Sequence, residues 1–473
     1  METLQRMANR GSISTAAYDI DNSLKFEADN SEYLKWTDIS TYATSARKKT
    51  FSFSVWFKIT ELGVQRTIWA TAANGYLLLQ ADGQLKWQQS YGGVVKTLNT
   101  NRLFRDTSAW YNVIIAVDTT QSTEANRTRL YVNGVEETSL TSTTYPSQNA
   151  EAENVYENHH SLGAYNSSSI FWSGYMADVA FISDAQITPS DVGEFDSDTG
   201  IWIPKAYSGG SAPSYFLEFK DSSDLGTATG LDADTLNNIA AADQSTDTPT
   251  NNFAVMNINS RTNSDITTIH GGTKVSNSGS SICSMNATIG VSKGKWYWEC
   301  RFANDPGNTN TVFVGVAAGN DPYVPHNSNN YLGQQSGYGS IGWYFVNGGI
   351  YNGTGTWSGP GYGNIIMVAL DMDNLKLYFG KEGSWENSSN PANGTSGIDI
   401  ATSFTSLLNG TDTILPSIAI GAGDYMDSMN FGGYANYTQS SAANDANGYG
   451  TFEYAPPSGY YALCTKNLSE FGG

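Results

Sequence analysis

Apolar and polar residues alternate with a period of two along most of the chain, and this pattern predicts β-strands. In residues 51–59 (FSFSVWFKI), Phe, Val or Ile occupies every second position, and Ser or Lys fills most of the others. Residues 110–117 (WYNVIIAV) are nearly apolar on both faces, which is typical of a central strand. Asn133-Gly134 suits the positive φ angles of a type I′ turn and predicts a hairpin over 129–135. No helical period continues for three turns, so helices should be short.

The second half of the chain shows the same strand pattern. In GKWYWECRF (294–302), Trp296, Trp298, Cys300 and Phe302 should share one face of a strand. Further strands are expected in residues 311–319, 340–353, 365–380 and 414–423. The chain is therefore predicted to be all-β, with two β-sandwich domains of the jelly-roll type.

Composition places the expected domain boundaries. Residues 222–246 are polar and show no alternation, and Pro249 fixes its own φ and favours an extended Thr248. The predicted organisation is an N-terminal arm over residues 1–20, a first sandwich over 21–219, an extended linker over 220–257 and a second sandwich over 258–473.

Charge and cysteine content narrow the function classes. The chain carries 45 acidic and 25 basic residues, a net charge of −20, which disfavours binding to a nucleic-acid backbone. Its 3 cysteines (Cys283, Cys300 and Cys464) lack metal-ligand spacing, so a disulfide framework is not expected, and Cys300, in phase with Trp296 and Trp298, should be a small core residue. Residues 1–15 lack the apolar segment of a signal peptide, and no apolar run approaches the ~20 residues of a membrane span, so membrane insertion is not expected.

Several longer segments carry a family resemblance. FSFSVWFKI (51–59), WYNVIIAVDTT (110–120), RLYVNGVE (129–136) and residues 174–207 resemble the laminin-G/concanavalin-A-like module. They are similar, more narrowly, to the version of this module in virion proteins of tailed bacteriophages, notably marine ones. In that group the module runs into a linker similar to DTPTNNFAVMN (247–257) and then into a SPRY-like domain, which the later strands also resemble.

The resemblance implies a function, a location and a metal to test. It implies a virion protein that contacts capsid, tail or fibre components, forms a homo-oligomer and binds host-surface polysaccharide as a tail fibre or adhesin. The alternative is a capsid or tail decoration protein with a purely structural role. Because laminin-G-like modules often bind one Ca²⁺ ion through Asp and backbone oxygens, Asp118 and Asp178 are the positions to test for Ca²⁺.

Aromatic residues in two Gly- and Asn-rich loops of the second half are candidate glycan ligands. Aromatic rings can stack on the apolar faces of sugars while amides and hydroxyls bind sugar hydroxyls. The candidates are Tyr323, Tyr331, Tyr338, Trp357 and Tyr362. The alternative is that these rings fill the ends of the sandwich or form subunit contacts.

Catalysis is not expected. Glu194-x-Asp196 has the spacing of two acids on one strand face, as glycosidases need, but Thr199 stands where a third acid would complete one laminarinase-like pattern. The surrounding sequence favours a turn with solvated acids. His159 and His160 are adjacent, so on a strand their side chains would point to opposite faces and could not bind one metal ion.

Overall fold

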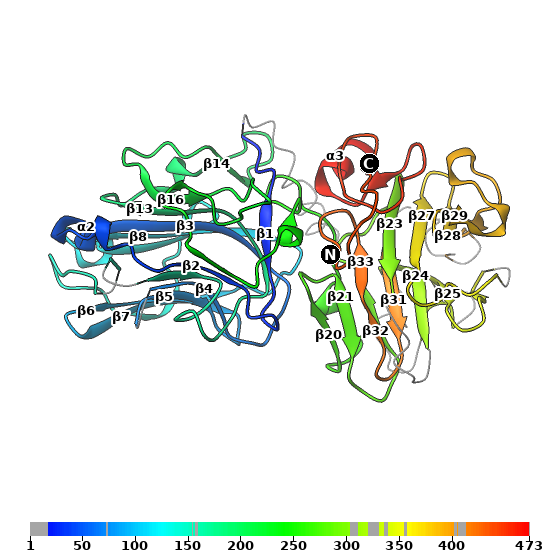
Figure 1. The fold of residues 1–473 in the computed structure, drawn as a ribbon, viewed down its shortest axis with the longest axis horizontal. Helices are drawn as coiled ribbons and strands as arrows, with labels where there is room; N and C mark the ends of the chain where they lie inside the picture. The colour runs from blue at the N-terminus through cyan, green and yellow to red at the C-terminus, as the bar shows by residue number, and fades with distance from the viewer. Residues whose placement is uncertain are drawn as a thin grey trace. The chain divides into compact units, whose positions relative to one another are not determined.

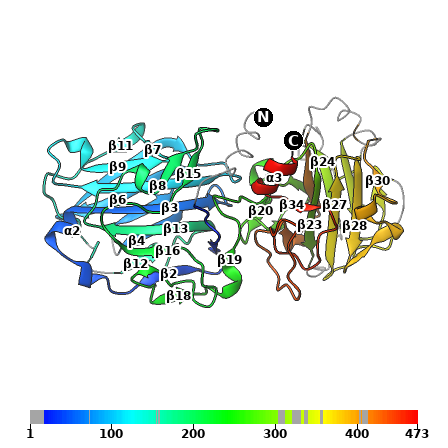
Figure 2. The ribbon, with the colours of Figure 1, turned by 90° about the horizontal axis from the view of Figure 1, so that it is seen from above.

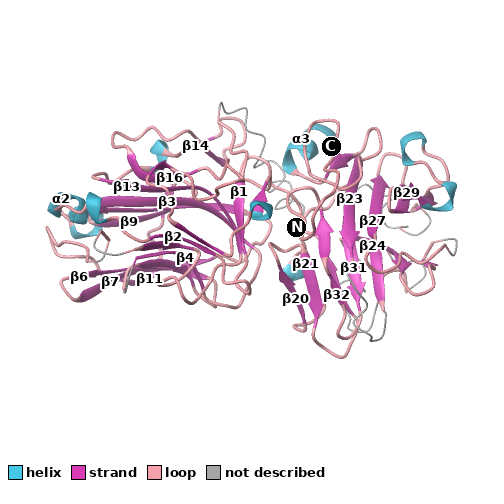
Figure 3. Ribbon diagram, in the orientation of Figure 1, coloured by secondary structure: helices cyan, strands magenta, loops and turns pink. Residues whose placement is uncertain are grey.

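The chain forms two compact units, with the boundary between Asn251 and Asn252. The computed structural model describes residues 18–71, 74–153, 155–156, 159–302, 311–319, 331–334, 339–353, 357–401, 404 and 413–472, and the predicted arm therefore lies outside the described residues up to position 17. Strands dominate both units and the helices are short (Figure 3). The predicted all-β class with two β-sandwiches is confirmed.

The first sheet of the first unit has nine described strands and is built around β3 (Thr50–Ile59). β3 pairs antiparallel with β8 (Trp110–Asp118) along one side and with β13 (Gly174–Ser183) along the other. The remaining strands are β1 (Ser23–Phe26), β9 (Thr128–Val132), β10 (Val135–Glu136), β16 (Pro213–Leu217), β17 (Thr229–Gly230) and β19 (Gln244–Ser245). Figure 2 shows β3, β8 and β13 side by side.

The second sheet of the first unit has eight described strands in the order β11-β7-β6-β5-β4-β12-β2-β18. They are β2 (Tyr33–Trp36), β4 (Arg66–Thr71), β5 (Tyr76–Leu79), β6 (Gln84–Tyr91), β7 (Val94–Leu103), β11 (Leu140–Thr143), β12 (His160–Leu162) and β18 (Thr235–Asn237). A separate hairpin joins β14 (Gly193–Phe195) to β15 (Trp202–Pro204). In Figure 1, β14 and β16 lie on the β3 side of this unit, whereas β5, β6 and β7 lie at its opposite side.

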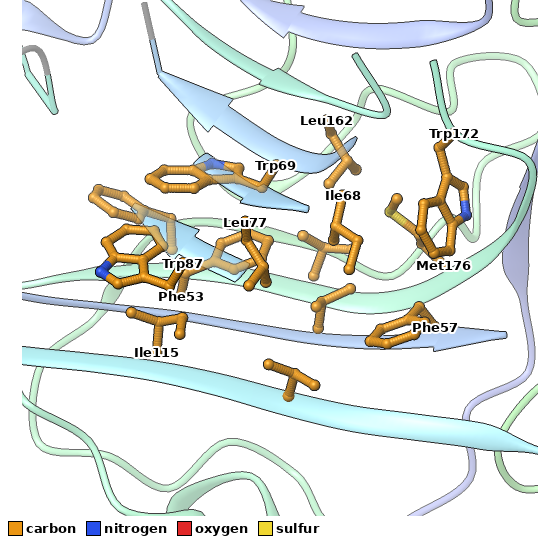
Figure 4. Packing of buried hydrophobic residues seen from close by; sticks show 14 of the residues in the cluster. Phe53, Phe57, Ile68, Trp69, Leu77, Trp87, Ile115, Leu162, Trp172 and Met176 are labelled. Carbon is orange, nitrogen blue, oxygen red and sulfur yellow. The ribbon is translucent and has the colours of Figure 1, made fainter. Parts of the chain in front are cut away.

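The core of the first unit is an aromatic stack between its two sheets (Figure 4). Phe53 of β3 stacks on Trp69 of β4 with ring centroids 4.9 Å apart, and Trp69 stacks on Trp87 of β6 at 5.7 Å. All three rings are almost fully buried. The alternating apolar positions of β3 therefore face the second sheet, as the period of two predicts.

Short helices complete the first unit. The only α-helix among its described residues is α2 (Ser45–Lys49), in which the Thr44 side chain accepts a hydrogen bond from the backbone N–H of Arg47. The 3₁₀ helices are η1 (Ser40–Tyr42), η2 (Glu124–Asn126), η3 (Pro189–Asp191) and η4 (Ala241–Asp243). The predicted hairpin at Asn133-Gly134 is present, with φ of 46° and 79°.

Residues 220–251 belong to the first unit, which differs from the expected linker over 220–257. β17 pairs with β16, β18 pairs with β2, and β19 pairs with β1, so this segment closes the edges of both sheets. Residues 252–257 belong to the second unit, where Phe253 forms a bridge with Cys464 and Met256 a bridge with Ala287. Strands of two or three residues are too short to show alternation, which is why the sequence pattern suggested a linker.

Two buried lysines fix this closing segment to the first unit. Lys58 Nζ lies 2.7 Å from the Asp247 carboxylate, and both side chains are at most 1% exposed. Lys25 Nζ lies 2.7 Å from the Asp243 carboxylate and 3.0 Å from that of Glu32. Burial acts to lower the pKa of Lys58, and Asp247 opposes this effect.

The second unit also consists of antiparallel sheets with short connections. A five-stranded sheet of described residues contains β22 (Cys283–Asn286), β31 (Ile414–Ile420), β24 (Val312–Ala318), β25 (Ser340–Tyr344) and β26 (Ile350–Tyr351). A seven-stranded sheet contains β29 (Ser384–Trp385), β28 (Lys376–Lys381), β27 (Ile365–Asp371), β23 (Lys295–Arg301), β33 (Ser428–Asn430), β30 (Ile398–Asp399) and β34 (Tyr461–Ala462). A three-stranded sheet contains β20 (Ile266–Ile269), β21 (Lys274–Asn277) and β32 (Tyr425–Met426), and the helices are η5 (Ile258–Ser260), η6 (Glu386–Ser388), η7 (Pro391–Asn393) and α3 (Thr465–Phe471).

β23 is buried on both faces, which its sequence did not predict. Trp296, Trp298 and Cys300 share one buried face, as expected. On the other face Glu299 is also fully buried, and its carboxylate accepts hydrogen bonds from Tyr297, Tyr437 and two backbone N–H groups.

All three cysteines of the chain are buried free thiols. In the part of the chain that is described, no helix is long and apolar enough to cross a membrane.

Candidate functional site

Polar side chains of β5, β6 and β7 form an ordered array on the outer face of the eight-stranded sheet. Leu77 and Leu79 of β5, and Leu85 and Trp87 of β6, point into the core. The residues between them therefore point outward, because side chains alternate along a strand. We call the outward set the amide face; it consists of Tyr76, Gln80, Gln84, Lys86, Gln88 and Asn99, all of them partly exposed.

Three amides of this face hold one another in fixed orientations. The Gln80 Nε2 group donates to Asn99 Oδ1 at 2.8 Å, and Asn99 Nδ2 donates to Gln84 Oε1 at 2.9 Å. Gln84 Nε2 in turn donates to the Thr141 hydroxyl on β11 at 3.2 Å. The network extends across four strands, so the amide planes are set before any ligand arrives.

Tyr76 contacts both an amide and a lysine of the amide face. Its hydroxyl donates to Gln88 Oε1 at 2.7 Å, and Lys86 Nζ lies 5.6 Å from its ring centroid. Tyr76 pairs with Gln88 across the β5–β6 hairpin, and Lys86 pairs with Asn99 across β6 and β7. An aromatic ring, an ammonium group and an amide are therefore held within one small area.

The segment of the chain after β12 bounds the amide face on one side. Ala70 and Ser161, which continue the Tyr76 row across β4 and β12, are fully buried. The segment after β12 turns back toward them, since the Ser161 hydroxyl donates to the carbonyl of Ala164. Tyr165 of this segment packs edge-on against Tyr76, with centroids 5.7 Å apart. This segment therefore bounds the amide face on the side of β4 and β12.

The three predicted aromatic residues of the second unit that the structure describes do not form one site. Tyr331 stacks on Phe313 at 4.7 Å, and Phe313 stacks on Tyr344 at 4.5 Å. Tyr351 packs edge-on against Phe313 at 5.2 Å. Burial of the hydroxyl raises the pKa of Tyr331. Tyr331 thus belongs to a cluster of three half-buried tyrosines around a buried phenylalanine on one face of β24 and β25.

Trp357 and Tyr362 lie in other clusters. Trp357 packs against Trp343 at 5.9 Å, and Tyr362 packs against Phe345 at 6.1 Å. Trp343 and Tyr344 are consecutive residues of β25, so their side chains point to opposite faces of the sheet. Trp357 therefore lies on the face opposite Tyr331. Tyr323 and Tyr338 lie outside the described residues.

Asp118 does not have free oxygens for a metal ion. Its carboxylate accepts hydrogen bonds from the Thr120 N–H and hydroxyl and from Gln121 Nε2. Burial acts to raise the pKa of Asp118, but these hydrogen bonds outweigh it and lower the pKa. The carboxylate therefore caps a turn after β8.

Asp178 lies in a different environment. It occupies a β-bulge of β13 with a φ of 44°, and Tyr18 donates a hydrogen bond to its Oδ2 at 2.7 Å. Burial raises the pKa of Asp178 to about 7. The bulge is level with Val55 of β3, whereas Asp118 pairs with Thr50, so the two carboxylates are roughly 16 Å apart along the sheet.

The two predicted Ca²⁺ positions therefore cannot hold one ion together. Among the described residues, no group of three or more His, Cys, Asp or Glu side chains is placed to bind a metal. As the described residues are placed, Asp118 and Asp178 do not form a shared Ca²⁺ site.

The other candidate residues have structural roles. Glu194 lies in β14 and not in the expected turn. Asp196 follows β14, is 8% exposed and caps a turn by accepting hydrogen bonds from the N–H groups of Asp198 and Thr199. His160 is fully buried in the first core, and burial lowers its pKa to about 3. His159 is only partly buried. The pair does not converge on one ligand.

The family comparison agrees with the fold of the first unit. Residues 28–193 match the family described as the concanavalin A-like lectin/glucanases superfamily. The match spans β2 to β13, and the amide face lies inside it. No curated protein matches the sequence significantly.

Solved structures with similar folds come from several sources. The SPRY domain of human HERC1 shares 17% identity, with 37% of this chain and 96% of that domain covered and a TM-score of 0.28. The heptameric SAP-like pentraxin of Limulus polyphemus shares 15% identity, with 36% and 80% covered and a TM-score of 0.25. The CBM40 of the Ruminococcus gnavus IT-sialidase, bound to α2,3 sialyllactose, shares 14% identity, with 34% and 91% covered and a TM-score of 0.24.

Sequence reasoning missed the amide face. One signal was present: in QLKWQQSY (84–91) the positions between the buried residues are Gln, Lys and Gln, without any acidic residue. The pairing of these positions with Tyr76 and Asn99 depends on the strand register, which a single strand pattern does not specify.

Proposed function

We propose that the protein is a non-catalytic glycan-binding protein whose contact surface is the amide face of the first unit. The observation that carries this proposal is the open sheet face on which Gln80, Gln84 and Asn99 fix one another and the hydroxyl of Tyr76 holds Gln88. The match of this region to a lectin-type family supports it.

The chemistry of the amide face suits a sugar. Sugar hydroxyls both donate and accept hydrogen bonds, and a carboxamide offers both functions in one plane. Because the amides are already ordered by the network, ligand binding costs little side-chain entropy. The Tyr76 ring adds an apolar surface for the C–H groups of a sugar ring.

Binding without hydrolysis is the expected outcome at this face. Glycosidases need two carboxyl groups across the scissile bond. The eight described strands of this sheet contain no Asp or Glu. A catalytic pair would have to come from outside the sheet.

The setting we propose is the surface of a tailed-bacteriophage particle. The resemblance of residues 51–59, 110–120 and 174–207 to phage virion modules motivates this setting. Display in many copies would convert weak binding by each sandwich into firm attachment to host polysaccharide. A decoration protein with a purely structural role is the second candidate, and it requires no glycan binding.

The test compares two glutamine variants of the full chain on an array of neutral and acidic microbial glycans. Gln88→Ala removes an amide of the amide face, and we expect at least tenfold weaker binding, about 1.4 kcal/mol or more. Gln148→Ala removes an exposed amide that bonds the Thr120 carbonyl elsewhere on the first unit, and binding should not change.

The outcomes separate the two candidates. Absence of any glycan ligand for the unmodified chain would exclude the proposed binding and favour the decoration role. Binding that survives Gln88→Ala would place the site elsewhere, with the Tyr331 cluster the next surface to vary. Immunogold microscopy of intact particles tests the virion setting independently of ligand binding.

A further inference from the structure

Charge is distributed unevenly over the first unit. The whole chain has a net charge of −20. The eight strands that form the sheet of the amide face nevertheless contain no acidic residue. They contain five basic residues, which are Lys35, Arg66, Lys86, Lys96 and Arg102. This sheet is therefore locally cationic within an acidic protein.

Lys86 is the cation at the middle of the amide face. Among the described residues no carboxylate lies within ion-pair distance of Lys86, whereas Arg66 pairs with Glu61 and Arg102 with Glu137. The Lys86 ammonium instead lies over the Tyr76 ring, with Nζ 5.6 Å from the ring centroid. The nearest acidic residue along the chain is Asp82 in the β5–β6 turn, where its Oδ1 accepts the N–H of Gln84.

The oxygen and nitrogen ends of the neighbouring amides differ in their hydrogen bonding. Oε1 of Gln84 and Oδ1 of Asn99 accept hydrogen bonds from other amides of the face. Gln88 Oε1 accepts the hydroxyl of Tyr76, which directs the donor end of this amide, Nε2, away from the tyrosine oxygen. Gln88 and Lys86 are two residues apart on β6 and point to the same side of the sheet. Beside Tyr76, the face therefore presents donors rather than acceptors.

We infer that the glycan bound by the amide face is anionic, with a carboxylate or sulfate group seated between Lys86 Nζ and Gln88 Nε2 over the Tyr76 ring. This inference rests on the proposed glycan binding and specifies its ligand class. An anionic oxygen group is acceptor-only, which complements a site of an ammonium and an amide N–H₂.

The negative charge of the whole protein does not prevent such binding. At physiological ionic strength charges are screened over about 8 Å. Acidic side chains beyond that distance contribute little at the amide face, whereas Lys86 would contact the ligand directly. The overall charge does oppose non-specific attraction of an acidic polymer, so any binding must come from a local cationic site.

The experiment uses the full chain and two matched pairs of polysaccharides. The first pair is alginate and its carboxyl-reduced form, and the second is dextran sulfate and dextran. Lys86→Gln should weaken binding of the acidic member about tenfold, because a hydrogen bond between two charged groups is stronger than one between a neutral amide and an anion. Lys96→Gln is the control, since it makes the same charge change on the same sheet. Lys96 pairs with the core-facing Gln89, so its side chain points away from the amide face.

Each outcome decides the inference. Binding of an acidic member, loss with Lys86→Gln and no loss with Lys96→Gln would support it, and the pair that responds tells carboxylate from sulfate. Equal binding of the neutral members would overturn it while leaving the proposed glycan binding intact. Binding of acidic members that is insensitive to Lys86→Gln would also overturn it. If none of the four polysaccharides binds, the inference falls, and the glycan array decides the proposed function separately.

Discussion

His160 shows how a polar residue is accommodated inside an aromatic core. Trp69 Nε1 donates to the Tyr215 hydroxyl at 2.9 Å, and this hydroxyl lies 3.2 Å from His160 Nδ1. His160 Nε2 lies 2.8 Å from the carbonyl oxygen of Val155. A neutral imidazole with its proton on Nε2 satisfies every one of these contacts. A protonated ring would place a second N–H against the hydroxyl and a charge among aromatic rings.

The buried His160 predicts a pH dependence of the stability of the first unit. Its pKa is lowered from 6.5 to about 3 in the folded protein, so below pH 6.5 the unfolded state binds more protons. The His160 contribution to stability should therefore fall as pH decreases from about 6.5 toward 3, by about 2 kcal/mol at pH 5. Because Asp178, whose pKa is raised to about 7, contributes with the opposite sign, the loss is measured as the difference between the unmodified protein and His160→Gln in urea unfolding at pH 7 and pH 5.

The control for His160 is its neighbour in the sequence. His159→Gln retains the buried imidazole and should follow the pH dependence of the unmodified protein, whereas His160→Gln should lose the part that destabilises the unit at low pH. If His160→Gln does not fold, NMR titration of the unmodified protein still decides the question. An imidazole signal of His160 that titrates near pH 6 would contradict the prediction.

At the level of residues, the sequence favoured structural roles for His159 and His160 over a shared metal site. It could not assign His160 a role, because its partners Trp69 and Tyr215 are distant in sequence. The sequence likewise could not assign roles to Asp118 and Asp178. Both were visible as acids near strands, but the turn that uses Asp118 and the bulge that holds Asp178 depend on tertiary pairing.

At the level of elements, long strands could be predicted and short ones could not. β3, β8 and β13 each contain at least nine residues and carry a clear apolar pattern. β19 has only two residues, and its position is fixed by contacts of its surroundings. Within this segment Asp243 and Asp247 each pair with a buried lysine, which the polar composition of residues 222–246 does not reveal.

The pair of Lys58 and Asp247 predicts a large effect of a single substitution. Asp247→Ala leaves the Lys58 ammonium buried without its carboxylate, which should destabilise the first unit by about 3–5 kcal/mol. The double variant Lys58→Met with Asp247→Leu removes both charges and should recover most of this loss. Thermal unfolding of the three proteins measures the effect. A double variant as unstable as Asp247→Ala would show that the ion pair is not the cause.

At the level of the whole molecule, the division into two β-sandwiches followed from strand patterns that repeat in both halves. The boundary did not, because it lies between Asn251 and Asn252 inside a segment that looks uniform in composition. The amide face also required the three-dimensional structure. Its residues are polar and unremarkable one by one, and only the register of β5, β6 and β7 brings them together.

The position of the boundary predicts which fragments fold. Residues 18–251 contain the carboxylates that pair with Lys25 and Lys58, and should unfold cooperatively as an isolated fragment. Residues 18–219 lack Asp243 and Asp247 and also lack β17, β18 and β19, so this fragment should be unfolded or aggregated. Residues 252–473 should fold independently. Near-ultraviolet circular dichroism of the three fragments checks the prediction, and a folded 18–219 fragment would contradict it.

The closure of the first unit has a mechanical consequence. β19 pairs with β1, and Thr250 Oγ1 exchanges hydrogen bonds with the backbone of Ile20, so the chain enters and leaves this sandwich at the same point. A force that pulls on the two ends of the first unit would act first on the β1–β19 pair and on the Thr250–Ile20 hydrogen bonds, and not on the aromatic core. Because its two ends lie side by side, the first unit has the geometry of a domain that can be inserted into a surface loop of another protein without long connecting segments.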